Sequence, residues 1–401
     1  MGSRPLLLMS NRLEMRQFDL TAKRYHTLAS NLSSDAVLDY WHKNQTLFWS
    51  DSTNGQIIAC KSLRMEDGML NNLGVCVREG SSGNEKQPNR ARFHGIAVDW
   101  IHGLAFWTEI NPNPSINVYD LSNNYARVII DTQMDQPKQI VVDPMKGLIF
   151  WADLASDSRI ERAGMNGQDR LTILKEPQLK RPTALTIDVL QQRLYWADSK
   201  LKSIMSADYY GQNIKTILHA HSIIRFPYSM VVFENQIFYS DRDQANILSM
   251  NRFDGSDIQI LFTRLPGPTS LRIYHEQLQP DQRNLCANLT CSQLCLPMAM
   301  LRATLPEKEK NNEVPAFMCL CTAGQKPDPK DPKKCIQAER TVEDLYVETS
   351  DLKRRRGFFS TLSIFVMIVM VIGAAYYWYT HRWRPVNSNG FQQFINPAFE
   401  S

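Results

Sequence analysis

Apolar and polar residues alternate in short runs along the first two thirds of this chain, and five of these runs close on an acidic residue. Each run joins aliphatic and aromatic residues to a small residue and then to Asp or Glu. The five runs are Leu47–Asp51, Ala105–Glu109, Ile149–Asp153, Leu194–Asp198 and Ile237–Asp241. Counted from the first aromatic residue, the last four recur at steps of 44, 45 and 43 residues. A repeat of this length indicates four-stranded units and predicts a β-propeller.

Each run is expected to form the second strand of a four-stranded unit. A short apolar strand precedes it, as in Ile140–Asp143, and two more strands follow around a turn glycine. Gly167, Gly211 and Gly255 fall 44 residues apart at this turn, where glycine adopts a positive φ without steric cost. β-branched and aromatic residues between turn residues are typical of strands. The fold class is therefore all-β.

Two leftover segments complete a sixth unit. Leu6–Met9, Met15–Asp19 and Tyr25–Leu28 have the pattern of the second, third and fourth strands of a blade, and Ser270–Tyr274 has that of a first strand. Joined, they close a six-bladed propeller over residues 1–276 and leave few exposed strand edges. The tandem aromatic residues are expected to pack between blades rather than to stack on a ligand. The tryptophans concerned are Trp49, Trp107, Trp151 and Trp196.

Six of the eight cysteines follow the repeats, and their spacing alone allows fifteen pairings. The order C-x4-C-x3-C, a long gap, C-x-C and a final cysteine resembles an EGF-like module, here over residues 282–336. That resemblance implies the disulfides Cys286–Cys295, Cys291–Cys319 and Cys321–Cys335. So small a module has little core, so the disulfides predict an oxidising compartment. The acidic residues of calcium-binding versions are missing from residues 279–285, and no metal or cofactor is predicted.

Two further cysteines and three sequons lie outside or beside that module. Cys60 and Cys76 flank a predicted hairpin around Gly68, where they either form a disulfide or remain two buried thiols. Beside an EGF-like module, Asn-x-Ser/Thr sequons are credible glycosylation sites. The sequons begin at Asn31, Asn44 and Asn288.

Residues 358–379 are almost wholly apolar and long enough to cross a bilayer as one helix. A stem (residues 337–357) precedes this predicted span, and a tail (residues 380–401) follows it. The basic run Lys353–Arg356 would place the N-terminal side in the cytosol by charge alone. The disulfide-rich module argues for an extracellular N-terminal side, and we give it more weight because a reducing cytosol would unfold it. The apolar stretch near Met1 is too short for a signal peptide, so we expect a fragment or a short isoform.

The tail ends in the sequence F-x-N-P-x-F, formed by Phe394, Asn396, Pro397 and Phe399. Asn-Pro favours a turn, and the extended residues before it can add to the edge of an adaptor sheet while the phenylalanines fill pockets. So close to a single span, this pattern predicts a sorting motif that recruits PTB-domain and clathrin adaptors.

The whole arrangement resembles the membrane-proximal half of the low-density lipoprotein receptor family, which includes vitellogenin and lipophorin receptors. The matching stretches are Ala97–Gly103, Val141–Pro144 and Arg193–Leu201. The resemblance implies an endocytic receptor of the plasma membrane and endosomes, with lipoprotein or vitellogenin-like cargo held by upstream repeats that this chain does not contain. It also implies that the propeller competes for those repeats at endosomal pH and so releases the cargo.

Two propeller histidines contribute to that acid switch in the family. One of them matches His102, whereas Met145 and Lys146 stand where the other is expected. Because a histidine gains charge between the cell surface and the endosome, His102 is our candidate for what remains of the switch. A solvated turn histidine is the alternative.

Other functions are less well supported by the sequence. A signalling or adhesion co-receptor could bind a protein ligand on the propeller face, and a truncated form could bind no cargo. The repeated acids sit at equivalent places, as a structural role predicts, and no catalytic constellation stands out, so no enzyme activity and no catalytic residues are predicted. A net charge of +4 over 401 residues gives no support for nucleic-acid binding.

Overall fold

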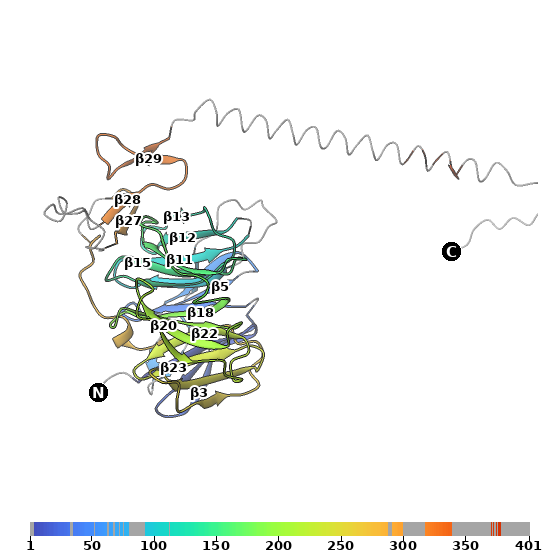
Figure 1. Cartoon of the computed structure of the whole chain (residues 1–401). Coiled ribbons are helices and arrows are strands. Elements are labelled where there is room, and N and C mark those ends of the chain that lie inside the picture. Colours follow the sequence, from blue (N-terminus) through green and yellow to red (C-terminus); the bar gives the residue numbers. More distant parts are fainter. Residues whose placement is uncertain are drawn as a thin grey trace, which may run out of the picture. The chain divides into compact units, whose positions relative to one another are not determined.

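Within the part of the chain that the structure describes, six antiparallel four-stranded sheets follow one another and form the blades of a propeller (Figure 1). This computed structural model describes residues 4–32, 35–51, 53–61, 64–66, 69–71, 73–74, 76–79, 93–111, 113–287, 291–299 and 317–338, and five residues between 370 and 377. The chain divides into two compact units, residues 1–337 and 338–401.

The strands of each blade follow the order expected from the repeat. Blade 1 contains β26 (Ser270–Tyr274), β1 (Leu6–Ser10), β2 (Glu14–Asp19) and β3 (Tyr25–Ser30). Blade 2 contains β4 (Leu38–Trp41), β5 (Thr46–Asp51), β6 (Gln56–Cys60) and β9 (Cys76–Glu79). Blade 3 contains β10 (Phe93–Asp99), β11 (Leu104–Glu109), β12 (Ser115–Asp120) and β13 (Ala126–Ile130).

The remaining three blades keep the same order. Blade 4 contains β14 (Pro137–Asp143), β15 (Leu148–Asp153), β16 (Arg159–Gly164) and β17 (Leu171–Leu174). Blade 5 contains β18 (Pro182–Asp188), β19 (Arg193–Asp198), β20 (Ser203–Asp208) and β21 (Lys215–Leu218). Blade 6 contains β22 (Pro227–Phe233), β23 (Gln236–Asp241), β24 (Asn246–Asn251) and β25 (Gln259–Phe262).

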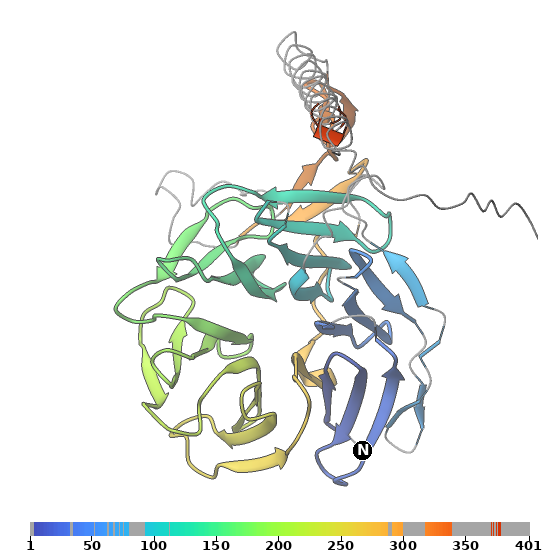
Figure 2. The same ribbon diagram turned by 90° about the vertical axis from the view of Figure 1, so that its right-hand side faces the viewer.

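The ring closes through the two ends of the propeller sequence, as predicted. β26 pairs antiparallel with β1, with Leu6 opposite Tyr274 and Ser10 opposite Ser270. Figure 2 shows the blades arranged in a ring, in which the last strand lies beside the first. Closure through one shared blade leaves that sheet with the same inner and outer strands as the other five.

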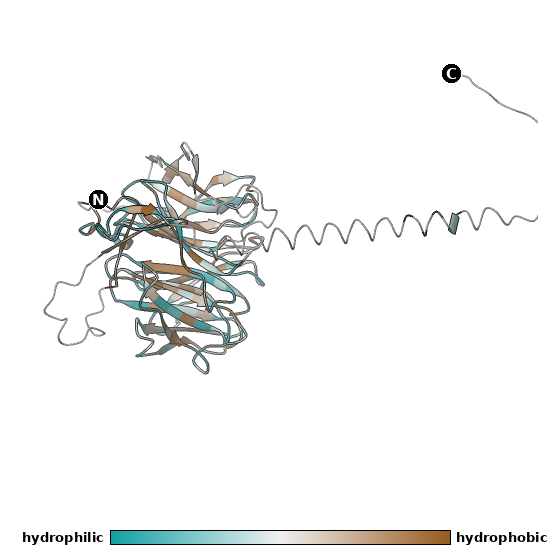
Figure 3. Cartoon of the chain, turned by 90° about the horizontal axis from the view of Figure 1, so that it is seen from above, coloured by the Kyte–Doolittle hydropathy of each residue, from teal (hydrophilic) through white to brown (hydrophobic). Residues whose placement is uncertain are grey.

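Aromatic residues of the repeated runs fill the seams between blades. Trp107, Trp151 and Trp196 are buried, and each belongs to a cluster that also contains residues of the preceding blade. Figure 3 shows the apolar positions spread through the strands of all the blades. Packing between blades is therefore the role of these rings, as the sequence indicated.

Three of the acids that end the runs hold the chain where it enters blades 4, 5 and 6. Asp153 accepts the backbone N–H of Gln136 at 2.7 Å. Asp198 accepts those of Lys180 at 2.6 Å and Arg181 at 2.8 Å, and Asp241 accepts those of the equivalent pair before β22. A buried carboxylate that receives several N–H groups is well satisfied. These acids are thus structural.

Blade 2 departs from the simple hairpin that the sequence suggested. A short hairpin of β7 (Arg64–Glu66) and β8 (Met69–Asn71) is inserted between its third and fourth strands. The amide of Gln17 in blade 1 holds it, donating to the carbonyl of Leu70 at 2.6 Å and accepting its N–H at 2.8 Å. Cys60 and Cys76 form a disulfide across β6 and β9 at the base of the insertion. Gly68 lies outside the described residues.

A cysteine-rich segment, residues 286–337, follows the propeller and a short 3-10 helix, η1 (Glu276–Leu278). It contains two hairpins, formed by β27 (Leu294–Pro297) with β28 (Phe317–Leu320) and by β29 (Gln325–Pro327) with β30 (Cys335–Gln337). Disulfides join Cys286 to Cys295, Cys291 to Cys319 and Cys321 to Cys335. The segment packs on blade 4, where the carbonyl of Met298 covers Gly147.

The described residues contain no helix with the length and apolar character needed to cross a bilayer. Most of the predicted span lies outside them, although the five described residues between Met370 and Tyr377 are helical. The stem beyond residue 338, the tail with its sorting motif and the sequon at Asn288 also lie outside the described residues.

Candidate functional site

A pocket of about 620 Å³ opens at the end of the ring where the innermost strands begin. Its walls come from the segments that enter blades 3 to 6, with His94 from blade 3, and from the loops between the second and third strands of blades 4 and 5. The lining residues include Gln136, Lys138, Gln139, Ser156, Ser158, Lys180, Arg181, Thr183, Lys200, Phe226 and Tyr228. The volume suits a small ligand or the end of a larger one.

The pocket is basic. Four cations line it, namely Lys138, Lys180, Arg181 and Lys200, and no Asp or Glu is among its described lining residues. Like charges gathered around a concave surface focus the potential and attract anions. Burial raises the pKa of Tyr228, whose ring lies 4.2 Å from the guanidinium of Arg242. That tyrosine is therefore a neutral hydrogen-bonding group at neutral pH.

The side chain of Gln139 forms the floor of the pocket and crosses between blades. It accepts the N–H of Leu185 at 2.7 Å and donates to the carbonyl of Tyr228 at 3.2 Å. A buried amide with both ends satisfied fixes the geometry around it. The floor thus ties blade 4 to blades 5 and 6.

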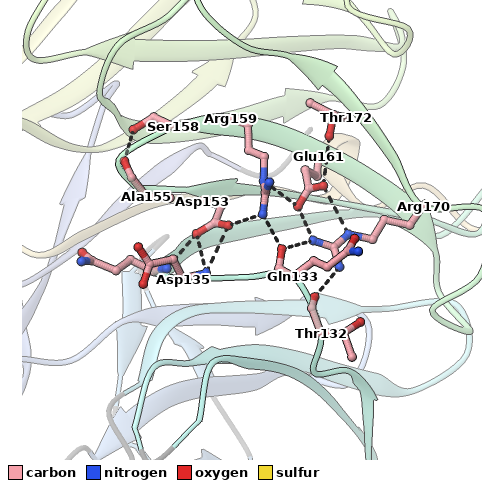
Figure 4. Close-up of polar contacts among 11 residues, drawn as sticks. Thr132, Gln133, Asp135, Asp153, Ala155, Ser158, Arg159, Glu161, Arg170 and Thr172 are labelled. Carbon is pink, nitrogen blue, oxygen red and sulfur yellow. Dashed lines mark hydrogen bonds and ion pairs between the residues drawn. The ribbon is translucent and has the colours of Figure 1, made fainter.

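An ionic network, drawn in Figure 4, holds the loop that leads into the pocket from blade 3. Arg170 donates to Glu161 at 2.6 Å and to the carbonyl of Gln133 at 2.8 Å. Arg159 donates to Asp153 at 3.0 Å, and that carboxylate also holds the entry to blade 4. Because Glu161 is buried between two arginines, these bonds brace the wall that carries Lys138.

His102 lies at the opposite end of the ring, in the turn between β10 and β11. Its side chain is 1% exposed, and its Nδ1 lies 2.7 Å from Asp99 Oδ2. Asp99 also accepts the backbone N–H groups of Ile101 and His102. The histidine of the proposed switch is thus buried and paired, and it does not reach the basic pocket.

Equivalent aspartates in the next two blades are bound differently. Asp143 of blade 4 accepts from Tyr209 of blade 5 at 2.8 Å, and Asp188 of blade 5 accepts from Arg252 of blade 6 at 2.6 Å. In blade 4 the position of these donors is occupied by Met165, which cannot donate. In blades 4 and 5 the next blade supplies the donor to the aspartate. In blade 3, His102 of the same turn donates to Asp99 instead.

The other predicted sites are placed as follows. Asn31 and Asn44 are exposed, and Asn31 has a φ of 60°. Lys146, which stands where the family has its second histidine, is partly exposed in the turn after β14. The sorting motif and Asn288 lie outside the described residues.

Sequence reasoning missed the basic pocket because its cations come from separate blades and form no local motif. Three of the four cations, Lys138, Lys180 and Arg181, lie where the chain enters a blade, whereas Lys200 follows the acid of its run. Aligning the repeats position by position could have revealed them.

Comparison with known proteins identifies the family of the chain. A model of the low-density lipoprotein receptor repeat class B matches residues 147–189 and 192–233. The human low-density lipoprotein receptor-related protein 8 is 30% identical over 346 residues, which are 85% of this chain and 34% of that protein. The chain belongs to the low-density lipoprotein receptor family. The similar proteins of this family are receptors, which agrees with the expectation that the chain is not an enzyme.

Two insect members of the family are also similar. The vitellogenin receptor of Solenopsis invicta is 29% identical over 322 residues, and the vitellogenin receptor Yl of Drosophila melanogaster is 26% identical over 342 residues. These matches cover 80% and 84% of this chain and 16% of each receptor. The chain thus spans about a third or less of the length of these relatives.

Solved structures support the fold alone. A chain in the crystal structure of a nidogen/laminin complex superposes with a TM-score of 0.56 at 18% identity, covering 67% of this chain and 98% of that one. TolB from Acinetobacter baumannii gives a TM-score of 0.51 at 11% identity, covering 67% and 66%. A propeller hosts many functions, so these likenesses carry no functional argument.

Proposed function

We propose that this chain is the propeller-bearing part of a single-pass endocytic receptor. Membership of the low-density lipoprotein receptor family carries the proposal, since the similar proteins are receptors. The F-x-N-P-x-F sequence from Phe394 to Phe399 supports the endocytic part, because its turn and aromatic residues suit PTB-domain adaptors that recruit clathrin.

The proposed topology puts the propeller and an EGF-like module outside the cell and the tail inside it. Four disulfides in residues 60–335 support an oxidising environment for that part. Residues 358–379 would form the single transmembrane helix. The receptor would then move between the plasma membrane and endosomes.

The proposed cargo is a lipoprotein or a vitellogenin-like protein, and acid would trigger its release. Two of the similar proteins are vitellogenin receptors, which supports this class. A switch at His102 would act through Asp99 and the turn that holds both residues, since the imidazole is buried. Cargo release at endosomal pH that is unchanged in His102→Ala would exclude this role.

The endocytic proposal is tested by uptake of a surface antibody in cells that express the chain fused to an efficient signal peptide. Asn396→Ala with Phe399→Ala is expected to slow internalisation several-fold, because turn and pocket contacts are both lost. Gln392→Ala with Gln393→Ala in the same tail is the matched control and should internalise normally. Equal uptake by both variants and the wild type would contradict the proposal.

A second candidate is a signalling or adhesion co-receptor, and the basic pocket favours it. A pocket lined by residues of blades 3 to 6 gives a ligand a binding place that needs no upstream repeats. In this case the two tail variants would internalise like wild type while ligand binding to the propeller persisted. The uptake experiment therefore distinguishes the two functions.

A further inference from the structure

The side-chain charges of Lys180, Arg181 and Lys200 in the basic pocket are at most weakly paired among the described residues. Lys180 forms an exposed pair with Glu176 at 3.7 Å, a contact weak enough for a ligand to replace. Among the described residues, no carboxylate forms an ion pair with Arg181 or Lys200. The guanidinium of Arg181 lies 5.8 Å from the ring of Phe226, which orients it without neutralising it. The pocket therefore suits a ligand with several anionic groups.

Four main-chain donors of the pocket wall are already used. Asp198 accepts the N–H groups of Lys180, Arg181 and Lys200, at 2.6, 2.8 and 2.9 Å. Asp153 accepts that of Gln136 in the same way. Extended peptides are usually recognised through free main-chain groups of a sheet edge or loop. This wall offers mainly side-chain groups, so it is poorly suited to an extended peptide.

The remaining lining groups fit a polar, hydroxylated ligand. The amide of Gln136 and the hydroxyl of Ser156 are on exposed residues of the wall. Tyr228 adds a ring and a neutral hydroxyl, because burial raises its pKa. Amides, hydroxyls and one aromatic face beside clustered Lys and Arg are a combination that serves sugars bearing anionic groups.

We propose that the pocket binds a sulfated oligosaccharide. Lys180, Arg181 and Lys200 would pair with the sulfate groups, and Gln136, Ser156 and Tyr228 would meet the sugar hydroxyls. This inference rests on the geometry of the propeller and not on the endocytic function, so either can fail alone.

The test uses the full chain in detergent micelles, immobilised for surface plasmon resonance. The probes are a heparin-derived hexasaccharide, its desulfated counterpart and an oligoglutamate peptide of similar charge. The variant Lys180→Gln/Arg181→Gln/Lys200→Gln is expected to lose affinity for the sulfated probe by at least about tenfold. Lys175→Gln/Lys215→Gln removes two exposed lysines outside the pocket and should retain affinity within about twofold. Thermal unfolding of each variant checks that it remains folded.

The outcomes are distinct. Binding of the sulfated probe that is weakened by salt, by desulfation and by the pocket variant supports the proposal. Equal loss in both variants would show non-specific attraction and overturn the site. Binding of oligoglutamate but not of the sulfated hexasaccharide would overturn the ligand class. If neither the sulfated hexasaccharide nor oligoglutamate binds, the proposal as a whole is overturned.

Discussion

At the scale of single residues, the blade aspartates depend on donors that differ from seam to seam. Tyr209 and Arg252 reach across to the preceding blade, whereas His102 serves Asp99 from within the same turn. The substitution is needed because Met165 fills the equivalent position in blade 4 with an apolar side chain. A buried carboxylate that loses a donor retains its desolvation cost, which explains why one donor replaces another.

His102→Ala should therefore destabilise the propeller even if it has no part in cargo release. Removing one hydrogen bond to the fully buried Asp99 is expected to lower the free energy of unfolding by about 1–3 kcal/mol. Urea denaturation at neutral pH measures this. His26→Ala on the exposed strand β3 is the control, expected within about 0.5 kcal/mol of wild type. A stable His102→Ala protein would argue against a structural role.

Glu109 takes the place of aspartate in its run, and its burial has a consequence for pH dependence. Burial raises the pKa of Glu109, although the hydrogen bond from Trp107 opposes this. Since the folded protein then holds the proton more tightly than the unfolded chain, stability is greatest below the unfolded pKa and falls as pH rises through the folded pKa.

Glu109→Gln removes this ionisation and keeps an acceptor for Trp107. The variant should match wild type near pH 4 and become the more stable of the two as the pH approaches about 7. Denaturation curves at several pH values in this range check the prediction. A difference that does not change with pH would show that Glu109 ionises equally well in both states.

At the scale of elements, the turns between the third and fourth strands of blades 4, 5 and 6 each fit against the preceding blade. Gly211 has a φ of +72°, and a Cβ atom there would lie 2.0 Å from the carbonyl oxygen of Ile173 in blade 4. The repeat thus uses glycine both for backbone conformation and for the close approach of blades. The regular step between these glycines follows from this double constraint.

Gly211→Ala should cost more than about 2 kcal/mol, because it combines a strained φ with a clash against backbone. Gly267→Ala is a matched control, since its φ is +56° and its nearest neighbour is a flexible arginine atom at 3.7 Å. The control should cost only about 1–2 kcal/mol. Thermal unfolding of both proteins compares them, and equal losses would mean that the blades adjust freely.

At the scale of the whole molecule, an ion pair near the axis joins the blade that closes the ring to the next two. Arg272 Nε lies 3.1 Å from Asp39 Oδ1, and Arg272 also donates to the carbonyl of Ile96 in blade 3. Asp39 accepts the N–H of Val98 at 2.8 Å. Burial raises the pKa of Asp39, and the charge of Arg272 opposes this. Closure is thus secured by strand pairing and by the polar contacts of Arg272 and Asp39.

Arg272→Met should leave Asp39 buried without its cation and lower stability by about 3 kcal/mol. This loss lies at the low end of the range for broken buried ion pairs, since the side chains of Arg272 and Asp39 remain 16% and 13% exposed. The double variant Arg272→Met/Asp39→Leu should recover most of the loss, because an apolar pair needs no mutual neutralisation. Chemical denaturation of the three proteins gives the answer. A double variant less stable than the single one would refute this account of closure.

Much of the fold could be predicted because short, repeated sequence motifs determine it. The runs that end in Asp153, Asp198 and Asp241 each supply a strand and the acid that holds the entry to the same blade, so the period of these runs alone indicates the blades. The pairing of Leu6–Met9 with Ser270–Tyr274 could be predicted because a closed ring needs a whole number of blades. The inserted hairpin around Leu70 could not be foreseen, since it is held by Gln17 of another blade.

What the sequence determined by itself is the ring: the strand order, the turn glycines and the aromatic residues at the seams all repeat along the chain. Only the tertiary structure decided that Lys138, Lys180 and Lys200 share one pocket and that His102 is buried against Asp99. The physical reason is distance along the chain. Periodic packing depends on neighbouring residues, whereas the basic pocket combines single residues from several blades, which only the packing of those blades brings together.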